Sequence, residues 1–230
     1  MSEKEADTPA ILAQGLWGRQ LLLGPMQNFV YLLGPEGGGE AVVVDPAWDV
    51  PAILAALAAA RRTLTGIILT HGHNDHVNGV PELLRTHDVP VYAQAEEVEF
   101  FDALKAIRAA ILPIAGSSEL RVGGLTLKLI HSPGHTPGSQ CLWCQGAVFT
   151  GDTLFLHACG RCDFRGGDAK TMYRTLTHLR ETLPGETRVF AGHDYSKVRS
   201  MQMRDVLAEN PYYQLADETA FVRERVKPRG

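Results

Sequence analysis

The sequence lacks a long hydrophobic run and has no excess of basic residues. Its longest uninterrupted apolar segment is the nine residues AILAALAAA (52–60), which is too short to cross a bilayer. Lysine and arginine number 22 against 26 aspartate and glutamate, so the net charge of −4 favours neither nucleic acid nor anionic lipid as a partner. The first ten residues, MSEKEADTPA, lack the basic start and apolar centre of a secretory signal. We expect a cytoplasmic protein that binds neither nucleic acid nor membrane, and the oligomeric state stays open between monomer and homodimer.

Cysteine is scarce, and its four copies form two pairs, CLWC (141–144) and CGRC (159–162). This spacing is close to that of a four-cysteine zinc knuckle. However, SQCLWC followed by QGAVFT predicts two short strands around a turn, and residues three apart on a strand point to opposite faces. Cys141 and Cys144 then cannot both bind one ion, so we expect buried free thiols.

Strand-like and helix-like segments alternate along the chain, which favours sheets covered by helices, an α/β fold. Short runs rich in branched and aromatic residues, bounded by turn-forming residues, predict the strands. These runs are 28–34, 40–46, 64–70, 89–93, 125–131, 139–144, 147–152 and 187–194.

Helix starts carry recognisable signals in two places. Asp49 and Pro51 predict the beginning of a helix over AILAALAAA, and Asp168 predicts another that ends at Pro184. Residues 196–226 are expected to be mostly helical, with an interruption near NPYY. We therefore predict one domain over residues 1–230 with a short helical tail from about residue 196.

Metal-ligating residues follow four of the predicted strands. HGHNDH (71–76) comes directly after an apolar run, and the other three strands lead into a histidine or an aspartate. Loops at strand ends collect ligand sites because the strands hold the loops that aim the side chains. Imidazole and carboxylate together suit zinc, iron or manganese. The candidate ligands are His71, His73, Asp75, His76, His135, Asp152 and His193.

The spacing within HGHNDH suggests two ions rather than one. In an extended loop His71 and His73 project to the same side, whereas Asp75 and His76 follow the start of a turn and can face a second ion. The other three ligands complete the sets: His135 the first, His193 the second and Asp152 both, as a bridge. The remaining histidines, His87, His131, His157 and His178, are expected to lie outside the site.

THGHNDHVNG resembles the HxHxDH signature of the metallo-β-lactamase superfamily, and SPGHTPGS, FTGDTLF and AGHDY are similar to its later motifs. The resemblance runs from GPMQNFVYLLG to AGHDYS. It implies an αβ/βα sandwich, in which two mixed sheets pack face to face with helices outside and the metals lie at one edge. It also implies that Asp45 steadies the metal loop without binding metal. Asp75 and Asp152 are expected to be catalytic through the ions that they hold.

The segment GDTLFLHACGRCDF is similar both to glyoxalase II, a hydrolase of S-acylglutathione thioesters, and to the persulfide dioxygenases. Both families place a basic residue nine positions after the bridging aspartate, where this chain has Arg161. The resemblance therefore implies that Arg161 binds a carboxylate of the thiol carrier. The alternative is an internal pair between Arg161 and Asp163. Cys159 and Tyr195 match positions that line the glutathione site of the dioxygenases.

The expected activity is that of a dinuclear metal-dependent hydrolase that acts on an S-acylglutathione-like thioester. Its two divalent ions are expected to be zinc, with iron or manganese as the alternatives. Because 37 residues follow His193, the chain resembles the short type of glyoxalase II. A mononuclear iron persulfide dioxygenase is the alternative activity, and a lactonase or another hydrolase of the same fold is a further one.

Overall fold

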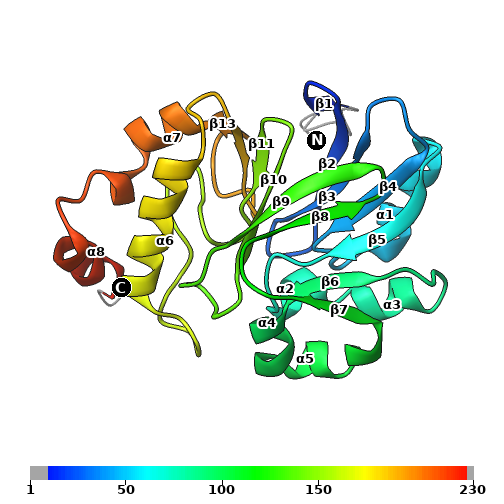
Figure 1. The fold of residues 1–230 in the computed structure, drawn as a ribbon, viewed down its shortest axis with the longest axis horizontal. Helices are drawn as coiled ribbons and strands as arrows, with labels where there is room; N and C mark the ends of the chain where they lie inside the picture. The colour runs from blue at the N-terminus through cyan, green and yellow to red at the C-terminus, as the bar shows by residue number, and fades with distance from the viewer. Residues whose placement is uncertain (1–9, 227–230) are drawn as a thin grey trace.

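The computed structural model describes residues 10–226 as two sheets packed face to face, with helices on both outer faces (Figure 1). The first sheet has the order β1-β2-β3-β4-β5-β6-β7. Its strands are β1 Ala10–Ala13, β2 Leu16–Leu23, β3 Asn28–Pro35, β4 Glu40–Val44, β5 Thr63–Ile68, β6 Val91–Gln94 and β7 Ile111–Ile114. The strands from β1 to β4 pair antiparallel, and those from β4 to β7 pair parallel. The sheet is therefore mixed, as predicted.

The second sheet has the order β13-β12-β11-β10-β9-β8. Its strands are β8 Ser118–Val122, β9 Leu125–His131, β10 Gln140–Cys144, β11 Ala147–Phe149, β12 Arg188–Phe190 and β13 Met201–Gln202. Only β11 and β12 pair parallel among these described strands; the other neighbours pair antiparallel.

The helices lie on the two outer faces, and Figure 1 shows α6, α7 and α8 on one side and α1 on the other. The helices are α1 Val50–Ala59, α2 Asn74–Val77, α3 Val80–Leu84, α4 Ala95–Phe100, α5 Asp102–Lys105, α6 Ala169–Thr182, α7 Met203–Glu209 and α8 Glu218–Arg225. Two 3-10 turns are also present: η1 Arg108–Ala110 precedes β7, and η2 Pro211–Tyr213 lies between α7 and α8. No helix within residues 10–226 is long and apolar enough to span a membrane.

Three apolar layers hold these elements together. One lies between α1 and the first sheet, one between the two sheets, and one between the second sheet and helices α6 to α8. The alternation along β10 shows how a strand serves two layers: Cys141 packs on the helix side and Cys144 between the sheets. The predicted divergence of these two thiols is confirmed.

The predicted helix starts are confirmed by their caps. The Asp49 carboxylate accepts from the Ala52 backbone N–H at 2.9 Å, and the Asp168 carboxylate accepts from that of Thr171 at 2.6 Å. The prediction that residues 196–226 are mostly helical was only partly right, because strand β13 pairs with β12 before α7 begins. The break near NPYY is present as η2, and residues 227–230 lie outside the described residues.

Several elements were not predicted. Edge strand β8, SELRV, is mostly exposed, and charged residues at an edge conceal the alternation that marks a strand. Strand β2 carries Gly18, Arg19 and Gln20 at its centre and is only partly buried. Short helices α2 to α5 have four to six residues each, too few to establish a helical period.

Candidate metal centre

The four predicted strand ends meet at one edge of the sandwich. His71 follows β5, His135 follows β9, Asp152 follows β11 and His193 follows β12. The parallel register of β11 and β12 pairs Phe149 with Phe190. Asp152 follows Phe149 by the same number of residues as His193 follows Phe190. This register explains why the two side chains arrive at the same place.

Potential ligand atoms that lie within 4.8 Å of one another form three groups. Two of them are the expected sets: His71, His73 and His135 form the first group, and Asp75, His76 and His193 the second. The third, Asp45, His71 and His76, shares one histidine with each of these sets. The grouping agrees with the division of HGHNDH between two ions. The chain begins to turn at His73, the N-cap of α2, so the residues after it face the other way.

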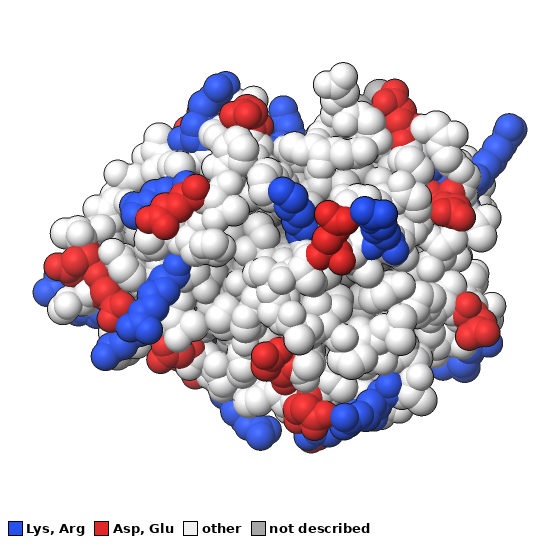
Figure 2. Space-filling model, viewed as in Figure 1, with Lys and Arg blue, Asp and Glu red and all other residues white. Residues whose placement is uncertain are grey.

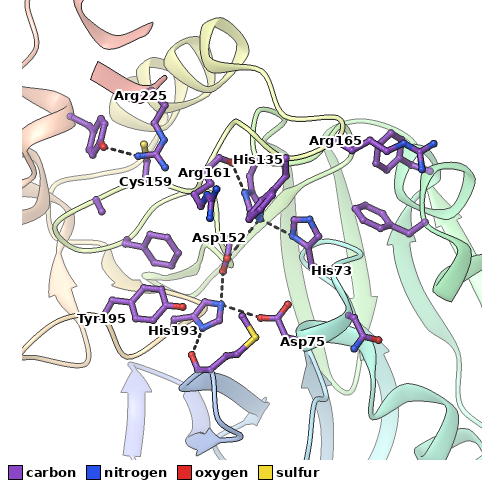
Figure 3. A pocket seen from close by; sticks show the side chains of 18 of the residues that line it. His73, Asp75, His135, Asp152, Cys159, Arg161, Arg165, His193, Tyr195 and Arg225 are labelled. Carbon is purple, nitrogen blue, oxygen red and sulfur yellow. Dashed lines mark hydrogen bonds and ion pairs between the residues drawn. The ribbon is translucent and has the colours of Figure 1, made fainter. Parts of the chain in front are cut away.

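Asp152 lies between the two groups (Figure 3). Its Oδ1 is 3.4 Å from the Nε2 atoms of both His76 and His193, and its Oδ2 is 3.8 Å from the Nε2 of His135. The neighbouring Gly151 has φ +48°, and a Cβ there would lie 2.3 Å from the Thr70 hydroxyl. A residue larger than glycine would therefore displace the turn that carries Asp152.

Backbone and carboxylate acceptors orient the histidine rings. The Nδ1 of His76 lies 3.0 Å from Asp45 Oδ2, and the Nδ1 of His193 lies 2.9 Å from the Met26 carbonyl oxygen. Both contacts require a proton on Nδ1 in the neutral ring, which leaves a lone pair on Nε2. Asp45 itself is held by the backbone N–H of Thr70 at 2.7 Å. The structure thus places Asp45 behind the metal loop, in contact with a ligand.

The residues fit a pair of cations. The Nε2 atoms of His76 and His193 lie 3.1 Å apart, and in the neutral rings their lone pairs face each other, which is repulsive unless a proton or a metal cation lies between them. His71 Nε2 and Asp152 Oδ1 are buried and have no hydrogen-bond partner among the described residues. Buried acceptors of this kind are normally satisfied, so their convergence points to a bound ion.

Burial and neighbouring charges lower the pKa of some of these histidines and raise that of others. Burial lowers the pKa of His71 well below its usual value, lowers that of His73 to about 4 and lowers that of His135. Burial opposes the charged form of His76 as well, yet its contacts with Asp152 and Asp45 raise its pKa well above the usual value. Neutral imidazole is the form that binds metal, and the first group holds it already.

Glu97 of α4 joins the two loops that carry the first group. Its Oε2 accepts from the Gly72 backbone N–H at 2.6 Å, and its Oε1 accepts from the Gly138 backbone N–H at 2.7 Å. The side chain is buried, and this burial raises its pKa. Sequence reasoning missed this residue because nothing local distinguishes it from Glu96 or Glu99.

Asn28 performs a similar role for the second group. Its Nδ2 donates to Asp75 Oδ2 at 3.0 Å, and its Oδ1 accepts from the Trp48 indole N–H at 2.8 Å. Asn28 is buried at the start of β3, and its amide is oriented by both partners. The sequence offered no signal for this contact, since Asn28 and Asp75 are 47 positions apart.

A cavity of about 850 Å³ opens over the metal centre. Aromatic side chains form part of its wall: Phe100, Phe101, Phe155, Phe164, Tyr195 and Tyr212. The three predicted substrate residues, Arg161, Cys159 and Tyr195, all line it (Figure 3). The Tyr195 ring stacks on the His193 ring at 4.7 Å, and burial raises the pKa of its phenol to about 12.

Arg161 forms the internal pair that was the alternative to substrate binding. Its Nε donates to Asp163 Oδ1 at 2.9 Å and its Nη2 donates to Oδ2 at 2.7 Å, while its guanidinium lies 4.1 Å from the centre of the Phe164 ring. Its carbonyl oxygen has a separate role, since it lies 2.7 Å from His135 Nδ1. A carboxylate contact from Arg161 stays a prediction, and it would compete with Asp163.

The residues set aside in the sequence lie outside both ligand groups. All four cysteines are buried free thiols, and no group of potential ligands among the described residues contains one. His87, His131, His157 and His178 contact hydroxyl, carbonyl or carboxylate oxygens instead. Figure 2 shows basic and acidic side chains interspersed over the face in view.

The family model of the metallo-β-lactamase superfamily matches residues 23–193, which include every candidate ligand. The chain belongs to the metallo-β-lactamase superfamily. The predicted sandwich and the order of the superfamily motifs are thereby confirmed.

Relatives within the superfamily are described with different activities. The chain is 30% identical over 199 residues to BaeB of Bacillus velezensis, described as a "probable polyketide biosynthesis zinc-dependent hydrolase", covering 86% of this chain and 87% of the relative. It is 35% identical over 204 residues to a hydroxyacylglutathione hydrolase of Alkalilimnicola ehrlichii, covering 87% of this chain and 75% of the relative. Among solved structures, ETHE1 from Myxococcus xanthus superposes with a TM-score of 0.82 at 30% identity, covering 92% of each chain.

Proposed function

We propose that the protein is a dinuclear metal-dependent hydrolase that cleaves thioesters of a small thiol carrier. The observation that carries this proposal is the pair of ligand groups with Asp152 between them, at the floor of a cavity with aromatic side chains in its wall. The zinc-dependent hydrolase and the hydroxyacylglutathione hydrolase among its relatives support it.

The chain would hold the first ion with His71, His73 and His135, the second with Asp75, His76 and His193, and both with Asp152. When bound, such ions supply Lewis acidity, which lowers the pKa of water toward about 7 and polarises a carbonyl group. Zinc suits this donor set, and iron or manganese would also fit it.

The protein's own groups orient and enclose the reaction. Asp45 and the Met26 carbonyl keep the Nε2 atoms of His76 and His193 turned inward. The aromatic side chains of the cavity offer apolar surface to a bound ester. Tyr195 keeps its phenolic proton at neutral pH, as any tyrosine with a pKa of about 10 or above does, and can donate a hydrogen bond into the cavity. A thiolate leaves without prior protonation, so the site needs no general acid of its own.

The test is to measure hydrolysis of S-lactoylglutathione and of an acyl-N-acetylcysteamine thioester by protein loaded with zinc, together with metal content. Two ions per chain and turnover of at least one thioester are expected. A protein that holds two ions but hydrolyses neither ester would contradict the proposal.

A persulfide dioxygenase is the second candidate, supported by the segment ACGRCDF and by the similarity to ETHE1. It predicts one iron per chain and oxygen consumption with glutathione persulfide. Measuring both activities on protein purified without added metal distinguishes the two candidates. A lactonase would instead hydrolyse a neutral lactone faster than either thioester.

A further inference from the structure

Three arginines line the cavity, and their surroundings differ. Arg161 is exposed and paired with Asp163 through two hydrogen bonds. Arg165 is exposed and lies 4.7 Å from the centre of the Phe100 ring. Arg225, from the last turn of α8, is only 5% exposed.

The Arg225 guanidinium is buried without a compensating carboxylate among the described residues. Its Nη1 donates to the Tyr212 hydroxyl at 2.6 Å, and its Nε is buried with no hydrogen-bond partner in that part of the chain. The ionisable groups close to it are Tyr212, Cys159 and Cys162. Burial raises the pKa of Cys162 to about 11, so this thiol is neutral at pH 7 and does not balance the cation.

An uncompensated buried charge is costly, and proteins normally pair such a group. Arg225 lies beside Cys159 in the cavity wall (Figure 3), and the Tyr212 that it contacts lines the same cavity. The Arg225 side chain lines the cavity, and a planar guanidinium matches the two oxygens of a carboxylate or a phosphate. The missing counter-charge can therefore come from a ligand.

We propose that Arg225 binds an anionic group of the substrate, a carboxylate or a phosphate, at the end of the cavity formed by Cys159 and Tyr212. This inference rests on the proposed function, because it takes the ligand to be a thioester whose carbonyl lies at the metal centre. The anion belongs either to the thiol carrier or to the acyl group, and the same chemistry serves both. Arg225, rather than the paired Arg161, is then the residue that selects charged substrates.

The experiment measures binding of three thioethers to the metal-loaded protein by isothermal titration calorimetry, so that no turnover is needed. S-butylglutathione carries its charge on the carrier side. S-(3-carboxypropyl)-N-acetylcysteamine carries it on the acyl side, and S-butyl-N-acetylcysteamine is neutral. Arg225→Gln should weaken one anionic probe about 10- to 100-fold and the neutral probe less than about threefold. The anionic probe that responds identifies the side that carries the charge.

Arg165→Gln is the matched control, because it makes the same chemical change in the same cavity at an exposed position. It should alter the three affinities by less than about threefold. Arg161→Gln provides the direct comparison: if it removes the preference for anions and Arg225→Gln does not, the inference is wrong.

The packing role of Arg225 must be separated from binding. Equal weakening of all three probes by Arg225→Gln, with a lower Tm, would assign Arg225 to the attachment of α8 and overturn the inference. Should Arg225→Gln fail to fold, Arg225→Lys keeps the charge but loses the planar fork, and it should weaken the responsive anionic probe several-fold more than the neutral one. An equal change for both would also overturn it. If the wild type binds the anion through Arg225 but hydrolyses no thioester, only the proposed function fails.

Discussion

Two segments of this chain look like metal motifs, and only one of them brings its candidate ligands together. HGHNDH brings four side chains to two adjacent groups, whereas the two CxxC pairs contribute to none of the ligand groups in residues 10–226. The difference lies in the backbone. HGHNDH leaves a strand and enters a turn, so its side chains can converge, but Cys141 and Cys144 lie on β10 and face different layers. Spacing predicts a metal site only when the local conformation is also known.

The two segments also differ in the residues that surround them. Behind the histidines, Asp45, Glu97 and Asn28 hold rings, loops and a carboxylate in place. The thiols of Cys141 and Cys144 pack among apolar side chains in two separate layers. A ligand site requires such supporting hydrogen bonds, and a packed thiol does not.

The largest effect is expected from Asp152→Ala. Asp152 is the side chain that contacts both ligand groups, so its loss should reduce the metal content from two ions to one or none and turnover by at least about 100-fold. Metal analysis and thioester hydrolysis measure the two effects. His178→Ala, at an exposed position on α6, is the control and should leave both unchanged. Full metal content with normal turnover in Asp152→Ala would refute the bridging role.

Asp45→Asn should have a smaller effect. The amide cannot reproduce both of the contacts that the carboxylate makes with Thr70 and His76, so the ring loses its fixed orientation. We expect the affinity for the second ion to fall about 10- to 100-fold, measured by competition with a chromogenic chelator. Asp49→Asn makes the same change at a helix cap, where asparagine serves equally well, and should not alter metal binding. Unchanged affinity in Asp45→Asn would show that this contact does not support the site.

Replacing Cys141 and Cys144 tests whether the cysteines, the other segment that resembles a metal motif, bind an ion. Replacing Cys141 by Ala and Cys144 by Val should leave two ions per chain and cost about 1–3 kcal/mol of unfolding free energy through lost packing. Metal analysis and urea denaturation measure these quantities. Loss of a zinc ion in this double variant would restore the zinc knuckle as an explanation of the cysteines.

Local rules allowed the convergence of the candidate ligands to be predicted from the sequence. Each candidate ligand lies within a few residues of a strand end, and the two helix caps at Asp49 and Asp168 are signals contained within four positions. Patterns of this length predict local structure from the sequence alone, because they depend on backbone geometry that the segment itself determines. The grouping of HGHNDH could be predicted for the same reason.

The supporting residues could not be predicted, because their partners are distant in sequence. Glu97 contacts backbone 25 and 41 positions away, and Asn28 contacts Asp75 across 47 positions. Arg225 lies in a short helix, ETAFVRER, that contains three other charged residues, and Arg225 is the charged residue of this helix that is buried. Which of these charges turns inward is decided by tertiary packing, and no local period reveals it.

The smallest effect concerns pH and returns to Cys141. Burial raises the pKa of this thiol from 9.0 to about 11, so the folded protein keeps its proton where the unfolded chain loses it. The stabilisation is complete below pH 9 and is lost as pH rises from about 9 to 11. Between pH 7 and pH 9.5 this single thiol should therefore remove up to about 1 kcal/mol of unfolding free energy.

Urea denaturation of the wild type and of Cys141→Ala at both pH values isolates this contribution, because buried tyrosines weaken both proteins alike at alkaline pH. The variant should be less stable at pH 7, and the gap between the two proteins should narrow at pH 9.5. A gap that stays constant would mean that the thiol does not change its proton affinity on folding, and that its burial among apolar side chains is less complete than the structure indicates.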